Sequence, residues 1–199
     1  MPTEQPLNIF TIGLSHHTAP VAAREALALS DEQTRALLGA VRGDGLLEEL
    51  LVLQTCNRTE FTFITGRPGE AVDGLRTHVA RVRGRGAPPP DALTRYDGPE
   101  AVRHLFRVAA GLDSQAVGEG EVLGQLKDAY RTALEARTAH FFLNKLLHAA
   151  FRVGKRVRSE TGLGTGASSL AAAAVRRARR ELGPLAGGTA LLVGAGETA

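Results

Sequence analysis

The chain is poor in cysteine and aromatic residues: it has one cysteine, Cys56, no tryptophan, two tyrosines and seven phenylalanines. A lone cysteine excludes an internal disulfide framework, so nothing in the composition indicates an oxidising compartment. No apolar run approaches the length that crosses a bilayer, and the start "MPTEQPLNIF" lacks the features of a secretion signal. We therefore expect a cytoplasmic protein that has no membrane partner.

Lysine is scarce as well: only Lys127, Lys145 and Lys155 stand beside twenty-one arginines, with a net charge of +3. The basic residues cluster in "FRVGKRVRSE" (151–160) and in "VRRARRE" (175–181). Basic stripes on helices suit a phosphate backbone, and a solvated helix face is the alternative that charge alone leaves open. One thiol and scattered histidines show no metal-ligand spacing, so we predict no metal site.

The first 98 residues predict a small α/β (α+β) sandwich. A chain of 199 residues with 43% hydrophobic residues can bury the core of one medium domain, or of a domain and a piece of another. Apolar residues that alternate, or that recur every three to four positions, predict the order β-α-α-β-β-α-β, which fits a ferredoxin-like fold. The expected elements are strands at 8–14, 49–55, 59–65 and 92–98, and helices at 21–29, from 31 to the glycines at 43 and 45, and 69–83. Ser30, with Gln33 three residues on, predicts a capping box at the start of the second helix.

From Pro99 onward the pattern is helical. We expect residues 99–160 to form a helical subdomain, 161–187 to carry a long linker helix, and 188–199 to begin a further domain. The predicted helices lie at 99–112, 121–136, 141–160 and 169–182. No internal repeat is present.

The last segment, "TALLVGAGETA", predicts a short strand that runs into a glycine-rich turn. Its pattern G-x-G-x-x-A is that of a dinucleotide-binding turn, in which small residues let the backbone approach a pyrophosphate. The candidate cofactor residues are Gly194, Ala195, Gly196, Glu197, Thr198 and Ala199. Because one strand and one turn cannot hold a dinucleotide, we expect the front part of a longer protein cut at the start of a Rossmann-type domain. A glycine-ended tail is the alternative.

The stretch "LVLQTCNRTEF" (51–61) raises the question of what Cys56 does. If the strand continues past Gln54, Cys56, Arg58 and Glu60 share one face, and the arginine stabilises a thiolate. Glu60 would oppose that effect or orient Arg58 through a salt bridge. If the chain turns at Cys56, the thiol is displayed at a strand end. An inert buried cysteine is the alternative.

Four blocks carry a resemblance to a known family. They are "GLSHHTAPVAARE" (13–25), "TCNRTEF" (55–61), "HLFRVAAGLDSQAVGEGEVLGQLKDAY" (104–130) and "GKRVRSETGLG" (154–164), and "LLVGAGETA" (191–199) follows them. In this order and spacing they resemble glutamyl-tRNA reductase over nearly the whole chain. The resemblance implies the N-terminal catalytic domain of that family, its linker helix and the first strand of its NADPH domain.

The resemblance also implies a chemistry. In that family a cysteine attacks the glutamate esterified to tRNA, and NADPH reduces the thioester to glutamate-1-semialdehyde, the precursor of 5-aminolevulinate and tetrapyrroles. Cys56 would be the nucleophile, and His104 would polarise the carbonyl or handle a proton near it. The family's substrate-contacting positions correspond to Thr55, Asn57, Arg58, Ser114, Glu119, Gly120, Glu121 and Gln125. Proline and glutamine are common in the family where this chain has Gly120 and Glu121.

The partners that the resemblance implies are glutamyl-tRNA and the downstream aminomutase. Full-length members form homodimers through a C-terminal helical domain. For this chain a monomeric state is an alternative. We expect the chain alone to bind NADPH poorly and to stop at thioester formation or slow ester hydrolysis. Two rivals are a non-catalytic paralogue that binds tRNA or a protein partner, and a cysteine-dependent aldehyde dehydrogenase that acts on small molecules. Neither accounts for all four blocks.

Overall fold

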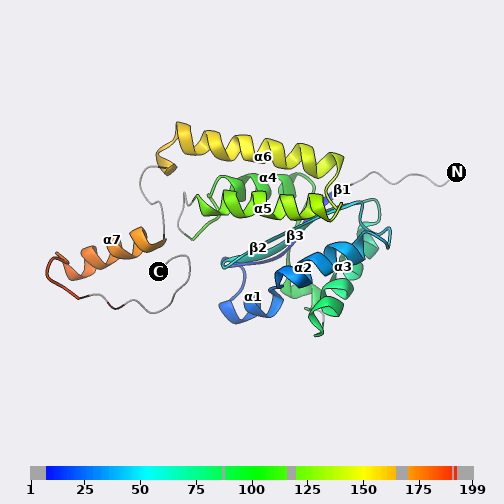
Figure 1. The fold of residues 1–199 in the computed structure, drawn as a ribbon, viewed down its shortest axis with the longest axis horizontal. Coiled ribbons are helices and arrows are strands. Elements are labelled where there is room, and N and C mark those ends of the chain that lie inside the picture. The colour runs from blue at the N-terminus through cyan, green and yellow to red at the C-terminus, as the bar shows by residue number, and fades with distance from the viewer. Residues whose placement is uncertain (1–7, 87, 116–119, 165–169, 190, 192–199) are drawn as a thin grey trace.

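The computed structural model describes residues 8–86, 88–115, 120–164, 170–189 and 191. The predicted cofactor turn, Gly194 to Ala199, and the predicted substrate residue Glu119 lie outside these ranges. Within them, a four-stranded sheet carries helices on both faces (Figure 1).

The sheet has the order β2-β3-β1-β4, and every neighbouring pair is antiparallel. This is the order expected of the predicted ferredoxin-like βαββαβ unit, so that prediction is confirmed. The strands are β1 (Asn8–Ser15), β2 (Glu49–Thr55), β3 (Arg58–Thr65) and β4 (Thr94–Asp97). Only two residues separate β2 from β3, so the chain reverses at the predicted nucleophile.

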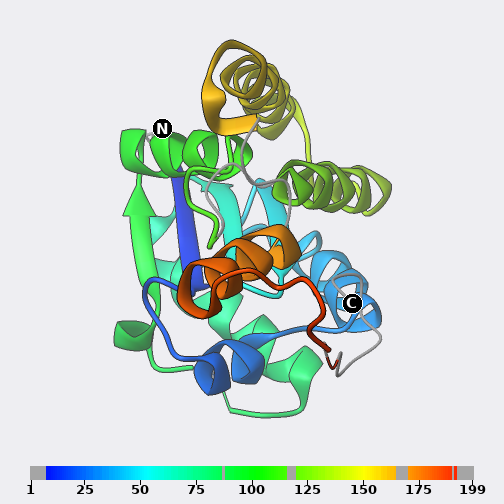
Figure 2. The same cartoon turned by 90° about the vertical axis from the view of Figure 1, so that its left-hand side faces the viewer.

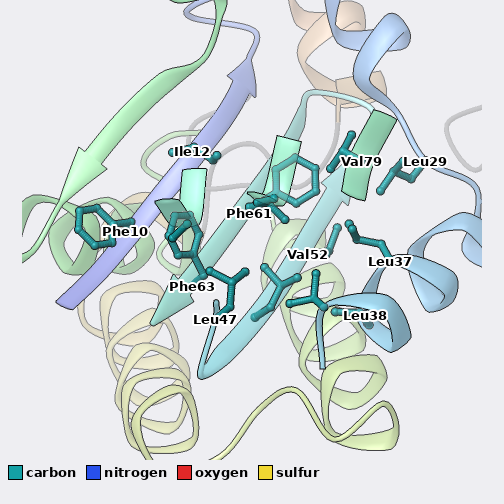
Figure 3. Close-up of a cluster of buried hydrophobic side chains, with 14 of the residues drawn as sticks. Phe10, Ile12, Leu29, Leu37, Leu38, Leu47, Val52, Phe61, Phe63 and Val79 are labelled. Carbon is teal, nitrogen blue, oxygen red and sulfur yellow. The ribbon is translucent and has the colours of Figure 1, made fainter. Parts of the chain in front are cut away.

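Three helices cover one face of the sheet: α1 (Val21–Leu27), α2 (Asp31–Val41) and α3 (Pro68–Arg83). Their apolar sides close on a core in which Phe10 stacks on Phe63 at 5.5 Å between ring centroids (Figure 3). Helix α2 begins with the predicted capping box, in which the Gln33 amide donates to Ser30 Oγ and the Ser30 amide donates to the Gln33 side chain.

Three further helices cover the opposite face: α4 (Pro99–Ala109), α5 (Glu121–Glu135) and α6 (Phe141–Glu160) (Figure 1). A second apolar core lies between them and the sheet. Gly154 of α6 packs directly against the carbonyl oxygen of Ala109, where any side chain would collide with the α4 backbone. The sandwich therefore has three layers, and every residue of β3 is buried.

The remaining elements are a 3₁₀ turn at Pro90–Ala92, another at Gly162–Gly164, and the helix α7 (Leu170–Leu182). Helix α7 confirms the helix predicted at 169–182; it lies apart from the three layers in Figure 1 and in front of them in the view of Figure 2. Among the described residues no helix is long and apolar enough to cross a membrane.

A buried carboxylate from the sheet caps the longest helix. Glu49, at the start of β2, accepts hydrogen bonds from the amides of His140, Phe142 and Leu143 at 2.8–2.9 Å. These amides begin α6 and have no partner within the helix, and a negative charge there also complements the helix dipole. Beside it, Thr138 exchanges hydrogen bonds with Leu50 and covers the outer edge of β2.

We expect Glu49→Ala to lower the free energy of unfolding by about 2–4 kcal/mol, because several buried amides lose a charged acceptor. Urea unfolding followed by circular dichroism measures this. The matched control is Glu48→Ala, which removes an exposed neighbouring carboxylate and should change stability by less than about 0.5 kcal/mol. Equal losses in the two variants would contradict the capping role.

Candidate active site

The site forms around the tight turn between β2 and β3, which consists of Cys56 and Asn57. Thr55 Oγ1 accepts hydrogen bonds from the amides of Asn57 at 3.0 Å and Arg58 at 3.2 Å, which fixes the turn. Cys56 is exposed. The sequence left open whether the strand runs through Cys56 or turns there, and the structure shows the turn.

Two neighbouring segments hold the backbone of this turn. Arg24 on α1 donates from Nη1 to the carbonyl oxygen of Cys56 at 2.7 Å. The amide of His16, just after β1, donates to the carbonyl oxygen of Asn57 at 2.9 Å. Because both contacts use main-chain oxygens, the Cys56 side chain is left free while its position is fixed.

A hollow lies on each side of Cys56. The first, about 20 Å³, faces α5 and is polar. The second, about 220 Å³, faces α1 and has Val21 and Ala28 in its wall. The first is lined by Thr55, Cys56, Asn57, Arg58, Ser114, Glu121, Val122 and Gln125. Seven residues predicted for the site therefore meet in one place, although three of them lie more than 50 positions from the other four in the sequence.

Gly120 precedes Glu121 and lies against α6 rather than in the hollow. A Cβ atom at Gly120 would come within 2.5–2.8 Å of the guanidinium of Arg158. The glycine therefore leaves room for Arg158 to pack on the start of α5, directly beside the polar hollow. This contact gives a physical reason for one of the two positions at which the chain departs from the family pattern.

A buried network of charged groups lies beneath the turn. Arg58, whose side chain is 1% exposed, pairs through Nη1 with Glu60 at 2.9 Å and through Nη2 with Asp113 at 3.3 Å. His104 Nε2 contacts the second oxygen of Glu60 at 3.0 Å, and its ring stacks on Tyr96 at 4.2 Å. Every charged group in this set has a protein partner.

The geometry leaves the predicted roles of His104 and Arg58 as predictions. His104 is buried and is not among the residues that line the two hollows. The guanidinium of Arg58 is engaged by two protein carboxylates, and Arg58 also lines both hollows, so its contact with the substrate stays a prediction. Arg58 and Glu60 do share a face of β3, as predicted, but Cys56 does not share it because the turn intervenes.

Burial on its own raises the pKa of Asp113, but the charges of Arg58, His104 and His17 outweigh it and hold that pKa below its ordinary value. Burial, and then the charge of His17, lowers the pKa of His16. His16 is therefore neutral at neutral pH. Both of its ring nitrogens are buried without a hydrogen-bond partner among the described residues.

The shift at Asp113 predicts a pH dependence. Its pKa is lower in the folded than in the unfolded state, so its contribution to stability is present above the unfolded value of about 3.9 and is lost as pH falls through the folded value. We expect the free energy of unfolding, measured in urea, to fall more between about pH 6 and pH 3 in the wild type than in Asp113→Asn. Parallel curves for the two proteins would contradict this.

Comparison with known proteins agrees with the geometry. A family model described as glutamyl-tRNA(Glu) reductase, N-terminal domain, matches residues 12–161. The chain belongs to the glutamyl-tRNA reductase family. Its relatives include the glutamyl-tRNA reductases of Nitratidesulfovibrio vulgaris, 46% identical over 96% of this chain and 43% of the relative, and of Deinococcus radiodurans, 42% identical over 100% of this chain and 54% of the relative.

A solved structure of the glutamyl-tRNA reductase from Methanopyrus kandleri is also similar. Its TM-score is 0.69 at 35% identity, and the match covers 91% of this chain and 41% of that one. The chain thus spans about half or less of the length of the glutamyl-tRNA reductases that it matches.

Sequence reasoning missed two residues of this glutamyl-tRNA reductase site. Arg24 lies three positions before Leu27 on the buried side of α1, and a charged residue on an apolar helix face is a signal that could have been used. Asp113 is contained in the block that begins at His104, but nothing local distinguishes it. Among the described residues no group of three or more histidine, cysteine or carboxylate side chains is placed to hold a metal ion.

Proposed function

We propose that this chain is the acyl-transfer part of an NADPH-dependent glutamyl-tRNA reductase and that Cys56 is its nucleophile. One observation carries the proposal: the thiol is exposed on a turn whose backbone is held on two sides, and it lies between two hollows. Such an arrangement leaves the sulfur atom accessible while its position stays fixed, which is what attack on a bound ester requires.

The proposed step is an acyl transfer. The Cys56 thiolate forms a bond to the ester carbonyl carbon of glutamyl-tRNA, the carbon–oxygen bond to the terminal ribose breaks, and the ribose oxygen leaves with a proton. The product is a thioester on Cys56, which accepts hydride more readily than an oxygen ester. Water can attack the thioester in place of hydride, and this hydrolysis releases glutamate slowly.

The polar hollow on the α5 side suits the amino acid. Aminoacylated glutamate carries a free ammonium group, and Glu121 supplies a carboxylate beside the sulfur atom. Ser114 and Gln125 add hydrogen-bonding groups to the same wall. Thr55 and Asn57 line the hollow on the side of the turn. Gly120 and Glu119 remain proposed contacts of the substrate.

Arg58 and His104 are best explained as positioning residues. Arg58 begins β3 directly after the turn, and its ion pair with Asp113 ties that strand to the residue that precedes Ser114. His104 orients Glu60, which in turn holds Arg58. The network thereby sets the distance between the turn that bears Cys56 and the segment that bears Ser114.

In the whole protein, NADPH would supply the hydride that releases glutamate-1-semialdehyde for tetrapyrrole synthesis. We propose that Gly194–Ala199 contribute to its binding. Glutamyl-tRNA is the proposed substrate, the downstream aminomutase a proposed partner, a homodimer the proposed assembly of the longer protein, and the cytoplasm its proposed location.

The test is to mix the chain with glutamyl-tRNA, quench in acid and measure the intact mass. We expect one glutamyl group per chain without NADPH. Folded protein that gains no mass under these conditions would overturn the proposal and would favour the non-catalytic paralogue. A small glutamate ester that reacts as fast as the tRNA ester would favour the small-molecule dehydrogenase instead.

The outer side of α6 is the proposed contact for the tRNA backbone. Lys145, Arg152, Lys155 and Arg156 are exposed on it, and among the described residues only Arg156 of these four forms an ion pair, with Glu160 at 3.0 Å. Arg158 on the same helix reaches Gly120 beside the polar hollow, so the basic surface continues to the site. Helix α7 adds an open hollow of about 300 Å³ lined by Arg176, Arg177, Arg180 and Glu181.

We expect the double variant Arg152→Glu, Lys155→Glu to weaken tRNA binding about 10- to 100-fold and to reduce the slope of log affinity against log salt by about two. Filter binding over a salt series measures both quantities. The control Arg35→Glu, Arg42→Glu changes two exposed arginines near α2, on the opposite layer, and should leave the affinity within about threefold. The same loss in both double variants would show a general charge effect and would contradict a contact on α6.

A further inference from the structure

The guanidinium of Arg24 has a hydrogen-bond donor that its contact with Cys56 does not use. Its side chain lies on the buried side of α1, the residue is 8% exposed, and Nη1 donates to the Cys56 carbonyl oxygen. The Nε–H group is buried and has no hydrogen-bond partner among the described residues. A buried guanidinium donor without an acceptor costs free energy, which a ligand that supplies an acceptor would recover.

Arg24 faces the larger of the two hollows at Cys56. This hollow has a volume of about 220 Å³ and is lined by Val21, Arg24, Glu25, Ala28, Thr55, Cys56, Arg58 and Thr59. Val21 and Ala28 give it an apolar wall, and the two threonines give it hydroxyl groups. Glu25 is the only acidic residue among these eight, and it is exposed at the rim.

We propose that this hollow binds the terminal nucleotide of the RNA, with Arg24 on its phosphate. This inference rests on the proposed function, because an aminoacyl ester has two halves that must lie on either side of the attacked carbon. The α5-side hollow offers Glu121, Ser114 and Gln125, which suit the charged amino acid. The α1-side hollow is larger, partly apolar and has an unused guanidinium donor, which suits a nucleoside and its phosphate.

The leaving group of the acyl transfer is the ribose of this nucleotide. Arg24 contacts the carbonyl oxygen of the same residue whose sulfur attacks, so the phosphate that it holds lies within one nucleotide of the reacting carbon. The Glu25 carboxylate, exposed at the rim, can accept hydrogen bonds from sugar hydroxyls or a base amino group. Binding of the nucleotide would therefore orient the ester bond toward Cys56.

The test compares two acyl donors: glutamyl-tRNA and the α-(4-nitrophenyl) ester of glutamate, which has no nucleotide. For Arg24→Gln we expect the ratio of the two acylation rate constants, tRNA over nitrophenyl ester, to fall at least about tenfold. Arg24→Lys, which keeps the charge, should recover part of the ratio. Arg35→Gln, an exposed arginine on α2, is the control and should leave the ratio unchanged.

A second measurement needs no variant. Adenosine 5′-monophosphate should slow the alkylation of Cys56 by iodoacetamide in the wild type, whereas adenosine should protect much less. If Arg24→Gln lowers both acylation rates equally and the nucleotide gives no protection, Arg24 only holds the turn and the inference is overturned. If wild-type protein is not acylated by glutamyl-tRNA, the proposed function fails, and nucleotide protection alone then decides whether this hollow is a nucleotide site.

Discussion

Replacing Cys56 with serine is expected to lower the rate of acyl transfer from glutamyl-tRNA by at least about a thousandfold. A thiol is ionised to an appreciable extent near neutral pH and its anion is strongly nucleophilic, whereas a serine hydroxyl needs a general base beside it. Among the residues that the structure describes, no histidine lines either hollow beside Cys56, and His104 pairs with Glu60. The oxygen atom would therefore occupy the right place without being activated.

The stability of the protein should not change with this substitution. The side chain of Cys56 is exposed, and the contacts that hold the turn involve Thr55 Oγ1 and the main-chain oxygens of residues 56 and 57. We expect the free energy of unfolding to stay within about 0.5 kcal/mol of the wild type. Single-turnover acylation measures the rate, and urea unfolding is the control. A serine variant that is acylated at the wild-type rate would exclude Cys56 as the nucleophile.

Replacing Arg58 with methionine is expected to cost about 3–5 kcal/mol of stability. The side chain of Arg58 is 1% exposed, and its removal leaves the carboxylates of Glu60 and Asp113 without their principal partner in a largely buried setting. Breaking a buried ion pair from one side is costly because the remaining charge keeps its desolvation penalty. The acylation rate should fall too, because the segments bearing Cys56 and Ser114 are no longer tied together.

A matched variant separates this effect from the general loss of an ion pair. Arg131→Met removes an arginine whose side chain is 67% exposed and pairs with Asp128 on the same helix, and it should cost less than about 1 kcal/mol. Both variants are compared with the wild type by urea unfolding. If Arg58→Met is no more destabilising than Arg131→Met, the network does not support the site. A double variant, Arg58→Met with Glu60→Leu, should recover part of the loss because one unpaired carboxylate is removed.

Much of the fold could be predicted from the sequence, because its local patterns agree with the tertiary structure. The apolar run before Gln54, the capping box at Ser30 and the helical spacing from Pro99 onward all appear at the expected positions. The second helical layer was harder to place. The alternation predicted β3 as a strand, but not that helices α4 to α6 cover its polar face, where Arg58 pairs with Glu60 and Thr62 with Thr11 of β1.

The candidate site was predictable only in part, and the reason is the distance along the chain. Resemblance brought residues 55–58 together with Ser114, Glu121 and Gln125, and the polar hollow contains all of them. The salt bridge of Arg58 with Glu60 was one of the expected alternatives, whereas its second partner could not be inferred, because Asp113 is 55 positions away and reaches it only through the packing of α4 on the sheet. The same packing places His104 against Glu60, a contact that the sequence did not predict.

The most direct test of the central claim is to locate the acyl group after the chain has reacted with glutamyl-tRNA. The quenched protein is digested at acidic pH and its peptides are sequenced by mass spectrometry, with and without hydroxylamine, which cleaves thioesters at neutral pH. We expect the glutamyl group on the peptide that contains Cys56 and its complete loss on hydroxylamine treatment. A glutamyl group on any other residue, or on the corresponding peptide of the Cys56→Ser variant in equal yield, would contradict the account.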